Sequence, residues 1–167
     1  MQIEIRRKGR TEYVAIRRRD GSRADFSIPS KGPISHDIVH YCVESVLGLR
    51  NGFWGLVASG EEPGAIQDRA KAGGHASAKR AQEPLPELVE LLQAERLVEC
   101  FAAESWSGET SDAGLLAMAI AGWGASYVPE LELSATDLAE VRAKLTELGS
   151  RWLALPEGEA LGLEWGE

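Results

Sequence analysis

The stretch IEIRRKGRTEYVAIRRRDGSRADFSI, residues 3–28, alternates apolar and polar side chains in three runs that are separated by short polar turns. A spacing of two residues places the apolar side chains of a β-strand on one face. Each run contains such a set, and the sets are Ile3 and Ile5, Val14 and Ile16, and Ala24, Phe26 and Ile28. Residues 1–28 are therefore predicted to form an antiparallel meander with a single apolar face.

The turn between the second and third runs decides how these two strands pair. A two-residue loop at Asp20 and Gly21 would place Val14 and Ile16 on the opposite face from Phe26. A three-residue loop over residues 19–21, with Gly21 left-handed, pairs residue 16 with 24 and residue 14 with 26. Because only this pairing gathers the apolar side chains on one face, we expect the three-residue loop.

The middle of the chain has helical periodicity. Residues 36–47 place their apolar side chains on one continuous arc, and Gly48 suits the end of that helix. A short helix or turn is expected over residues 53–59. Residues 60–83 predict a long flexible connection with at most one weak helical turn. Residues 84–149 predict a helical layer.

The helical layer and the end of the chain complete the predicted fold. The run LLAMAIAGWG, residues 115–124, is apolar on all sides, which is typical of a central helix. A helix starting at Ser134 or Thr136 is expected to end at Gly149, and residues 151–165 predict a hairpin of two short strands. We therefore expect a single α+β domain. Its antiparallel sheet, of about five strands, would be built from N- and C-terminal strands with four or five helices between them.

Composition places the 167-residue chain among ordinary globular proteins, with 44% apolar and 26% charged residues. The N-terminal MQIEIRRKGR lacks the apolar core of a signal peptide, and no apolar run approaches the ~20 residues of a membrane span. A cytoplasmic location without membrane contact is the resulting expectation. Cys42 and Cys100 lie inside apolar helical patterns and are predicted to be small buried side chains.

Charge is distributed unevenly along the chain. Residues 1–31 carry nine Lys and Arg against four Asp and Glu, whereas residues 82–167 carry four against seventeen. The clusters RRKGR and RRRDGSR could form a basic surface, but overall acidity and the absence of a recognisable reading motif count against nucleic acid as a partner. The asymmetry favours instead a protein partner or a homo-oligomer held by complementary charges.

The segment HDIVHYCVE, residues 36–44, contains the residues with the clearest chemical potential. His36 and His40 are four residues apart, which places their Cβ atoms ~5–6 Å apart on one helix face. Two such imidazoles can converge on one zinc ion with bonds of ~2.0–2.1 Å. Glu44 stands about 12 Å from His36 along the helix axis, so one ion cannot be held by all three residues.

A third ligand is therefore expected from another part of the chain. His75, in the predicted connection, is the first candidate, and Glu61, Glu62 and Asp68 come after it. Asp37 is the candidate catalytic residue, either as a group that orients a metal ligand or as a base that would activate metal-bound water. Glu44 is expected to fix the ring of His40.

The spacing is similar to the HExxH helix of zinc metalloproteases, in which the Glu is the general base. Asp37 stands at that position here and is one methylene shorter, and no family is assigned on these five residues. Uptake of zinc or another divalent metal would weaken below pH ~6 if the histidines have ordinary pKa values.

Three interpretations remain open from the sequence. The histidine helix could hold a divalent metal and serve a metal-dependent hydrolase. The chain could instead be a non-enzymatic interaction or regulatory module that uses its charge asymmetry. His36 and His40 could also be ordinary helix-edge residues that hydrogen-bond a carboxylate or a backbone carbonyl.

Overall fold

The computed structural model describes residues 1–72 and 84–166 of the chain. The sheet and the helices follow one another in this order: β1 (Gln2–Lys8), β2 (Thr11–Arg17), β3 (Arg23–Pro29), α1 (His36–Leu47), α2 (Phe53–Ala58), α3 (Pro63–Ala72), the 3₁₀ helix η2 (Pro86–Leu88), α4 (Val89–Ser107), α5 (Asp112–Ala125), α6 (Ala135–Ala154) and β4 (Ala160–Glu164). The strands thus come from both ends of the chain and the helices from the residues between them, and the predicted α+β domain is confirmed.

The described residues form one antiparallel sheet of four strands in the order β3-β2-β1-β4. Between β2 and β3, Val14 pairs with Phe26 and Ile16 with Ala24, which is the predicted register. Gly21 has a φ of +87°, so the left-handed position of the three-residue loop is occupied by the residue that tolerates it best. On the other side of β1, β4 adds a fourth strand, with Ile5 opposite Leu161.

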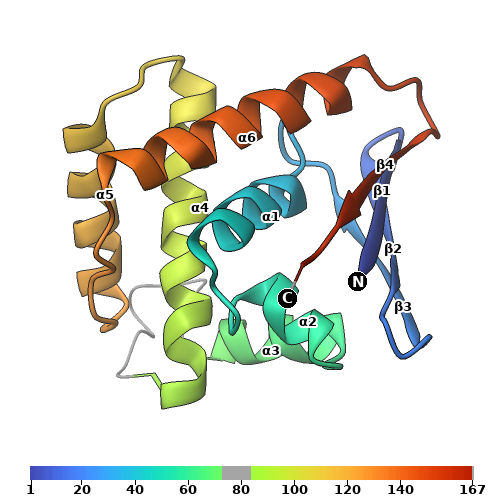
Figure 1. Ribbon diagram of the computed structural model, residues 1–167, viewed down its shortest axis with the longest axis horizontal. Coiled ribbons are helices and arrows are strands. Elements are labelled where there is room, and N and C mark those ends of the chain that lie inside the picture. The colour runs from blue at the N-terminus through green and yellow to red at the C-terminus, as the bar shows by residue number, and fades with distance from the viewer. Residues whose placement is uncertain (73–83, 167) are drawn as a thin grey trace.

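The helices lie on one side of the sheet, and α1 occupies the centre between the sheet and α4 (Figure 1). Residues 37–44 of α1 are all buried, because α4, α6 and α2 pack against that helix. Ser35 precedes the helix and Gly48, with a φ of +67°, ends it as expected. The histidine helix is therefore the central helix of the domain, and its polar side chains at His40 and Glu44 are inside the molecule.

The apolar helix α5, expected to be central, is peripheral. Only Leu115, Ala119 and Trp123 of α5 are buried, and Figure 1 shows the helix at the edge of the domain beyond α4. Met118 and Ile120 are each 45% exposed. The helix packs mainly against α4, so its apolar composition does not lead to burial on all sides.

The predicted C-terminal hairpin over residues 151–165 is wrong. Residues 151–154 continue α6, and the single strand β4 follows. Gly149 lies inside this helix and does not end it. A Cβ atom at Gly149 would lie 2.8 Å from Cδ1 of Ile34. The glycine instead makes room for Ile34, which lies just before α1, and Trp152 extends the buried face of α6 one turn further.

The predicted connection over residues 60–83 contains a helix that was not expected at this length. Pro63 begins α3, in the position where a proline suits a helix, and Ile66 is buried in the core. Arg69 forms an ion pair with Glu61 at the start of the segment. Residues 73–83, with His75 among them, lie outside the described residues. No helix among the described residues is long and apolar enough to cross a membrane.

Candidate metal centre

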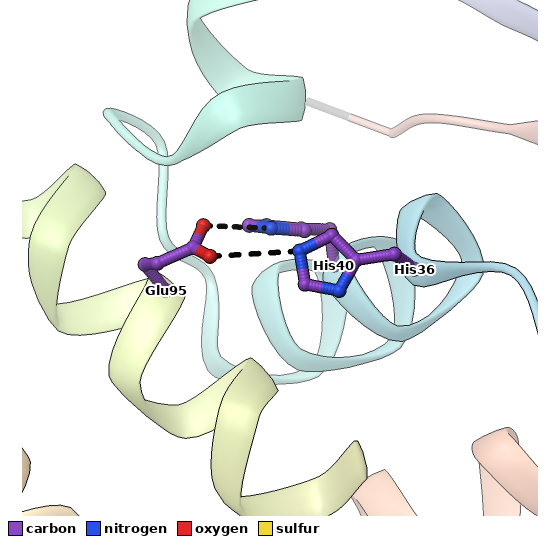
Figure 2. A group of neighbouring side chains, drawn as sticks. All are labelled: His36, His40 and Glu95. Atoms are coloured by element: carbon purple, nitrogen blue, oxygen red, sulfur yellow. Dashed lines mark ion pairs between the residues drawn. The ribbon is translucent and has the colours of Figure 1, made fainter. Parts of the chain in front are cut away.

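Two helices bring three potential ligands together. His36 and His40 come from successive turns of α1, and Glu95 comes from the middle of α4. The two rings are 4.8 Å apart between centroids and nearly perpendicular, and one oxygen of Glu95 faces each ring (Figure 2). The distances are 3.5 Å from His36 Nε2 to Glu95 Oε1 and 3.0 Å from His40 Nε2 to Glu95 Oε2.

The three residues differ in their contact with solvent. The His40 side chain is buried, the Glu95 side chain is 14% exposed, and the His36 side chain is 41% exposed. The cluster therefore has a buried side on α1 and α4 and an open side at His36.

Glu44 holds His40 from the other side. Its Oε1 lies 2.9 Å from His40 Nδ1, and this oxygen also accepts the backbone N–H of Phe53 at 2.9 Å. Its Oε2 accepts the backbone N–H of Trp54 at 2.7 Å. The completely buried carboxylate thus connects His40 to the first turn of α2, where the helix dipole favours a negative charge.

Gly52 allows this arrangement. A Cβ atom at Gly52 would lie 2.6 Å from the Glu44 carboxyl carbon, closer than such atoms approach in proteins. The absence of a side chain at residue 52 therefore creates the space in which the carboxylate lies.

His40 bridges two carboxylates, and its pKa reflects this. Burial by itself lowers the pKa of an imidazole, but the charge of Glu95 and the hydrogen bonds from Glu44 and Glu95 outweigh that effect and raise the pKa of His40 to about 10. At neutral pH the ring is therefore an imidazolium that donates through both nitrogens. A metal ion at Nε2 would have to replace one of these protons.

Asp37 is buried next to His36. Its backbone oxygen accepts a hydrogen bond from Trp54 Nε1 at 3.0 Å, while its Oδ2 has no hydrogen-bond partner among the described residues. Burial raises the pKa of Asp37 to about 6, although attraction to His40 and His36 opposes the shift. Near pH 7 the carboxyl group is thus mostly ionised and close to the pH at which it takes up a proton.

A cavity of about 320 Å³ adjoins the cluster. His36, Asp37, His40 and Glu95 all contribute to its wall, and the unpartnered Oδ2 of Asp37 is buried behind it. This volume is at the lower end of the ~300–1,000 Å³ found for small-molecule sites. The arrangement can therefore admit a small molecule beside the cluster.

The described residues place Glu95, and none of the other acidic candidates, beside the two histidines. Glu61 pairs with Arg69, Glu62 lies 3.6 Å from Arg18, and the exposed Asp68 lies 3.6 Å from Lys71. His75 belongs to the residues that are not described. Glu95 was missed because its role depends on a contact between distant segments.

One signal in the sequence could have indicated Glu95. It follows Leu91 and Leu92 by four and three residues and precedes Val98 by three, so an acidic side chain occupies a core position of α4. An ionisable residue on the apolar stripe of a helix needs a polar partner inside the protein. The two histidines of residues 36–40, for which a third ligand was expected, were candidates for that partner.

The donor set fits a divalent transition metal. One ligand atom from each of His36, His40 and Glu95 lies within 4.8 Å of the others. Bonds of ~2.0–2.1 Å in a tetrahedron separate ligand atoms by about 3.3 Å, so only small movements would bring the three atoms onto one ion. A carboxylate on the second nitrogen of a metal-binding histidine, as Glu44 provides, is the usual support.

The thiols take no part in this cluster. Cys42 and Cys100 are buried as predicted, and burial raises the pKa of Cys42 to about 12 and that of Cys100 to about 11. Comparison of the chain with models of known families, with curated proteins and with solved structures found no match.

Proposed function

We propose that the protein binds zinc or another divalent transition metal through His36, His40 and Glu95 and uses it in the hydrolysis of a small molecule. The observation that carries the proposal is the convergence of these three side chains from two helices, with Glu44 hydrogen-bonded to the far nitrogen of His40. A cluster of two imidazoles and one carboxylate with an open side is a donor set used in catalytic zinc sites.

The charges of the cluster support the exchange of a proton for a metal ion. With His40 protonated, one positive charge lies between the carboxylates of Glu44 and Glu95. A divalent ion together with a neutral His40 would place two positive charges against the same two carboxylates. Because buried charges are costly unless they are balanced, the better balance of charge around Glu44 and Glu95 favours metal uptake.

The chemistry would come from a water molecule on the open side of the site. A divalent zinc lowers the pKa of such a water to ~7 and polarises a carbonyl or phosphoryl oxygen beside it. Asp37 lines the same cavity, and its Oδ2 has no partner among the described residues. The Asp37 carboxylate would accept the proton of the attacking water and return it to the leaving group.

The direct test is the metal content of protein purified in zinc-supplemented medium, followed by zinc titration of the chelator-treated protein. We expect one zinc per chain. His36→Ala should weaken binding by at least about 100-fold, and because the His36 side chain is 41% exposed, its removal should leave the fold intact. Glu95→Gln should weaken binding to a similar extent. Glu99→Gln, on the same helix and more exposed, is the matched control and should bind zinc as the wild type does.

Wild-type protein that contains no metal and takes up none on titration would overturn the proposal. The cluster would then be a buried ion pair that joins α1 to α4. Equal weakening by Glu95→Gln and Glu99→Gln would also contradict it, because the effect would then come from general charge rather than from coordination.

An interaction role is the second candidate function. One observation favours it: the outer face of the sheet is not covered by helices in Figure 1, and it carries exposed charged side chains, the basic Arg6, Lys8, Arg17 and Arg23 together with the acidic Glu4, Asp25 and Glu164. Such a surface could associate with the acidic C-terminal half of a second copy or with an acidic protein.

A further inference from the structure

We infer that the cavity beside the metal centre takes a small organic anion, whose negative group binds Lys31 and Lys71. This inference rests on the proposed function and specifies the substrate class of the same site. Both lysines line the cavity together with the cluster residues, although they come from separate segments. Lys31 lies between β3 and α1, and Lys71 lies in the last turn of α3.

Neither lysine is committed to a strong ion pair. No ion pair of Lys31 is found within residues 1–72 and 84–166. Lys71 lies 3.6 Å from Asp68, but both side chains are mostly exposed, at 61% and 82%, so this pair contributes little and is readily exchanged. Two lysine side chains that line one cavity, and that have no strong ion pair among the described residues, favour a ligand that brings negative charge.

The remaining wall of the cavity is apolar except for Gln67, and it indicates what the rest of the ligand should be. Ile28 and Phe53 line it from the sheet side and α2, and Ile66 and Leu91 line it from α3 and α4. Apolar side chains around a few polar groups are typical of small-molecule sites. The cavity volume of about 320 Å³ limits the ligand to the size of one ring or a short chain rather than a polymer.

The metal and the two lysines would bind different parts of the ligand. Glu95 and Glu44 balance a bound divalent ion, so the lysines are left to attract the ligand. The ligand would then place its anionic end at Lys31 and Lys71, its apolar body against Phe53 and its reactive bond at the open side of the metal. A carboxylate and a phosphate share this chemistry, and an experiment has to separate them.

The test uses cobalt(II) in place of zinc, because its visible absorption bands change when a ligand enters the site. The probes are benzoate and phenylphosphonate, with benzamide as the neutral counterpart of benzoate. We expect each anion to bind at least about tenfold more tightly than benzamide, with an affinity that falls as salt is raised. Whichever anion binds more tightly identifies the preferred anionic group.

The variants Lys31→Gln and Lys71→Gln should each weaken anion binding about tenfold and leave the affinity for cobalt and for benzamide unchanged. Lys8→Gln removes the same charge from the outer face of the sheet and is the matched control, which should behave as the wild type does. Anion binding that is no tighter than benzamide binding, or that all three variants weaken equally, would overturn the inference.

A parallel titration of the metal-free protein by calorimetry separates the two proposals. If the chain takes up no cobalt, the proposed function fails. In that case anion binding that depends on Lys31 and Lys71 would still support the inference, and its absence would overturn the inference as well. If cobalt binds normally and the lysine variants have no effect, only the inference fails.

Discussion

Gly52→Ala tests the geometry that holds His40, without changing any ligand. The φ of Gly52 is −70°, which any residue can adopt, so the effect of alanine is purely steric. The new Cβ atom would lie 2.6 Å from the carboxyl carbon of Glu44 and 2.7 Å from its Oε2. Because separations below 3.0 Å are not tolerated, the carboxylate has to move away from the first turn of α2.

The expected cost follows from the contacts that this carboxylate makes. It accepts hydrogen bonds from Phe53, Trp54 and His40, and a bond to a charged acceptor contributes about 1.5–3 kcal/mol. Loosening one of these hydrogen bonds destabilises the protein, and overpacking adds a further cost of about 1–3 kcal/mol. Alanine also restricts the unfolded chain more than glycine does, which stabilises the folded protein by about 0.4–1 kcal/mol. We therefore expect the free energy of unfolding to fall by about 2–4 kcal/mol.

Urea unfolding followed by circular dichroism measures this loss, and zinc titration of the folded variant should show affinity reduced by about 10–100-fold. Gly124→Ala is the matched control, because no atom lies within 4 Å of its Cβ position in α5, and it should be neutral or slightly stabilising. A Gly52→Ala protein within about 0.5 kcal/mol of the wild type and with unchanged zinc affinity would refute the reasoning.

The remaining predictions concern pH and salt. Because the pKa of His40 is raised to about 10 from an ordinary value near 6.5, the stability it contributes to the metal-free protein is complete below pH ~6.5 and is lost as the pH rises through 10. The free energy of unfolding of the metal-free protein, measured at pH 6.5, 7.5 and 8.5, should fall by up to about 1.4 kcal/mol per pH unit, and saturating zinc should remove this dependence. Equal slopes with and without zinc would contradict the prediction. Zinc affinity, measured by competition with a coloured chelator, should rise about tenfold per pH unit over this range, because Nε2 of His40 has to lose its proton before it can bind the metal. With ordinary histidine pKa values the affinity would level off above pH ~6. A flat profile would argue against His40 as a ligand. If the basic face of the sheet binds the acidic half of another copy, light scattering should detect an oligomer at low salt that dissociates at high salt, and a monomer under both conditions would remove that candidate.

Local patterns predicted the parts of the fold that depend on near neighbours. The register of β2 and β3 followed from the turn at Gly21 and the apolar side chains around it. The contact between His40 and Glu44 follows from their spacing of four residues on one helix. Gly48 ended α1 because a left-handed residue is needed there.

The parts that were wrong or missed depend on which segments pack together. An apolar run gives no information about which helix has neighbours on all sides, so α5 was predicted to be central, whereas α1 is the central helix. Gly149 looked like a helix end because its sequence neighbours do not include Ile34, the residue that needs its space. Glu95 could be assigned only when α4 was placed beside α1.

The pairing of β1 with β4 has a consequence for synthesis of the chain. Residue 2 lies opposite residue 164, and the first and last strands lie side by side in Figure 1. During translation, β1, β2 and β3 can form early, but β1 keeps an open edge until β4 has left the ribosome. An exposed strand edge is a template for pairing with another chain. A nascent chain stalled or truncated before residue 160 should therefore associate with its own copies and depend on chaperones, whereas the same strands are protected once β4 is in place.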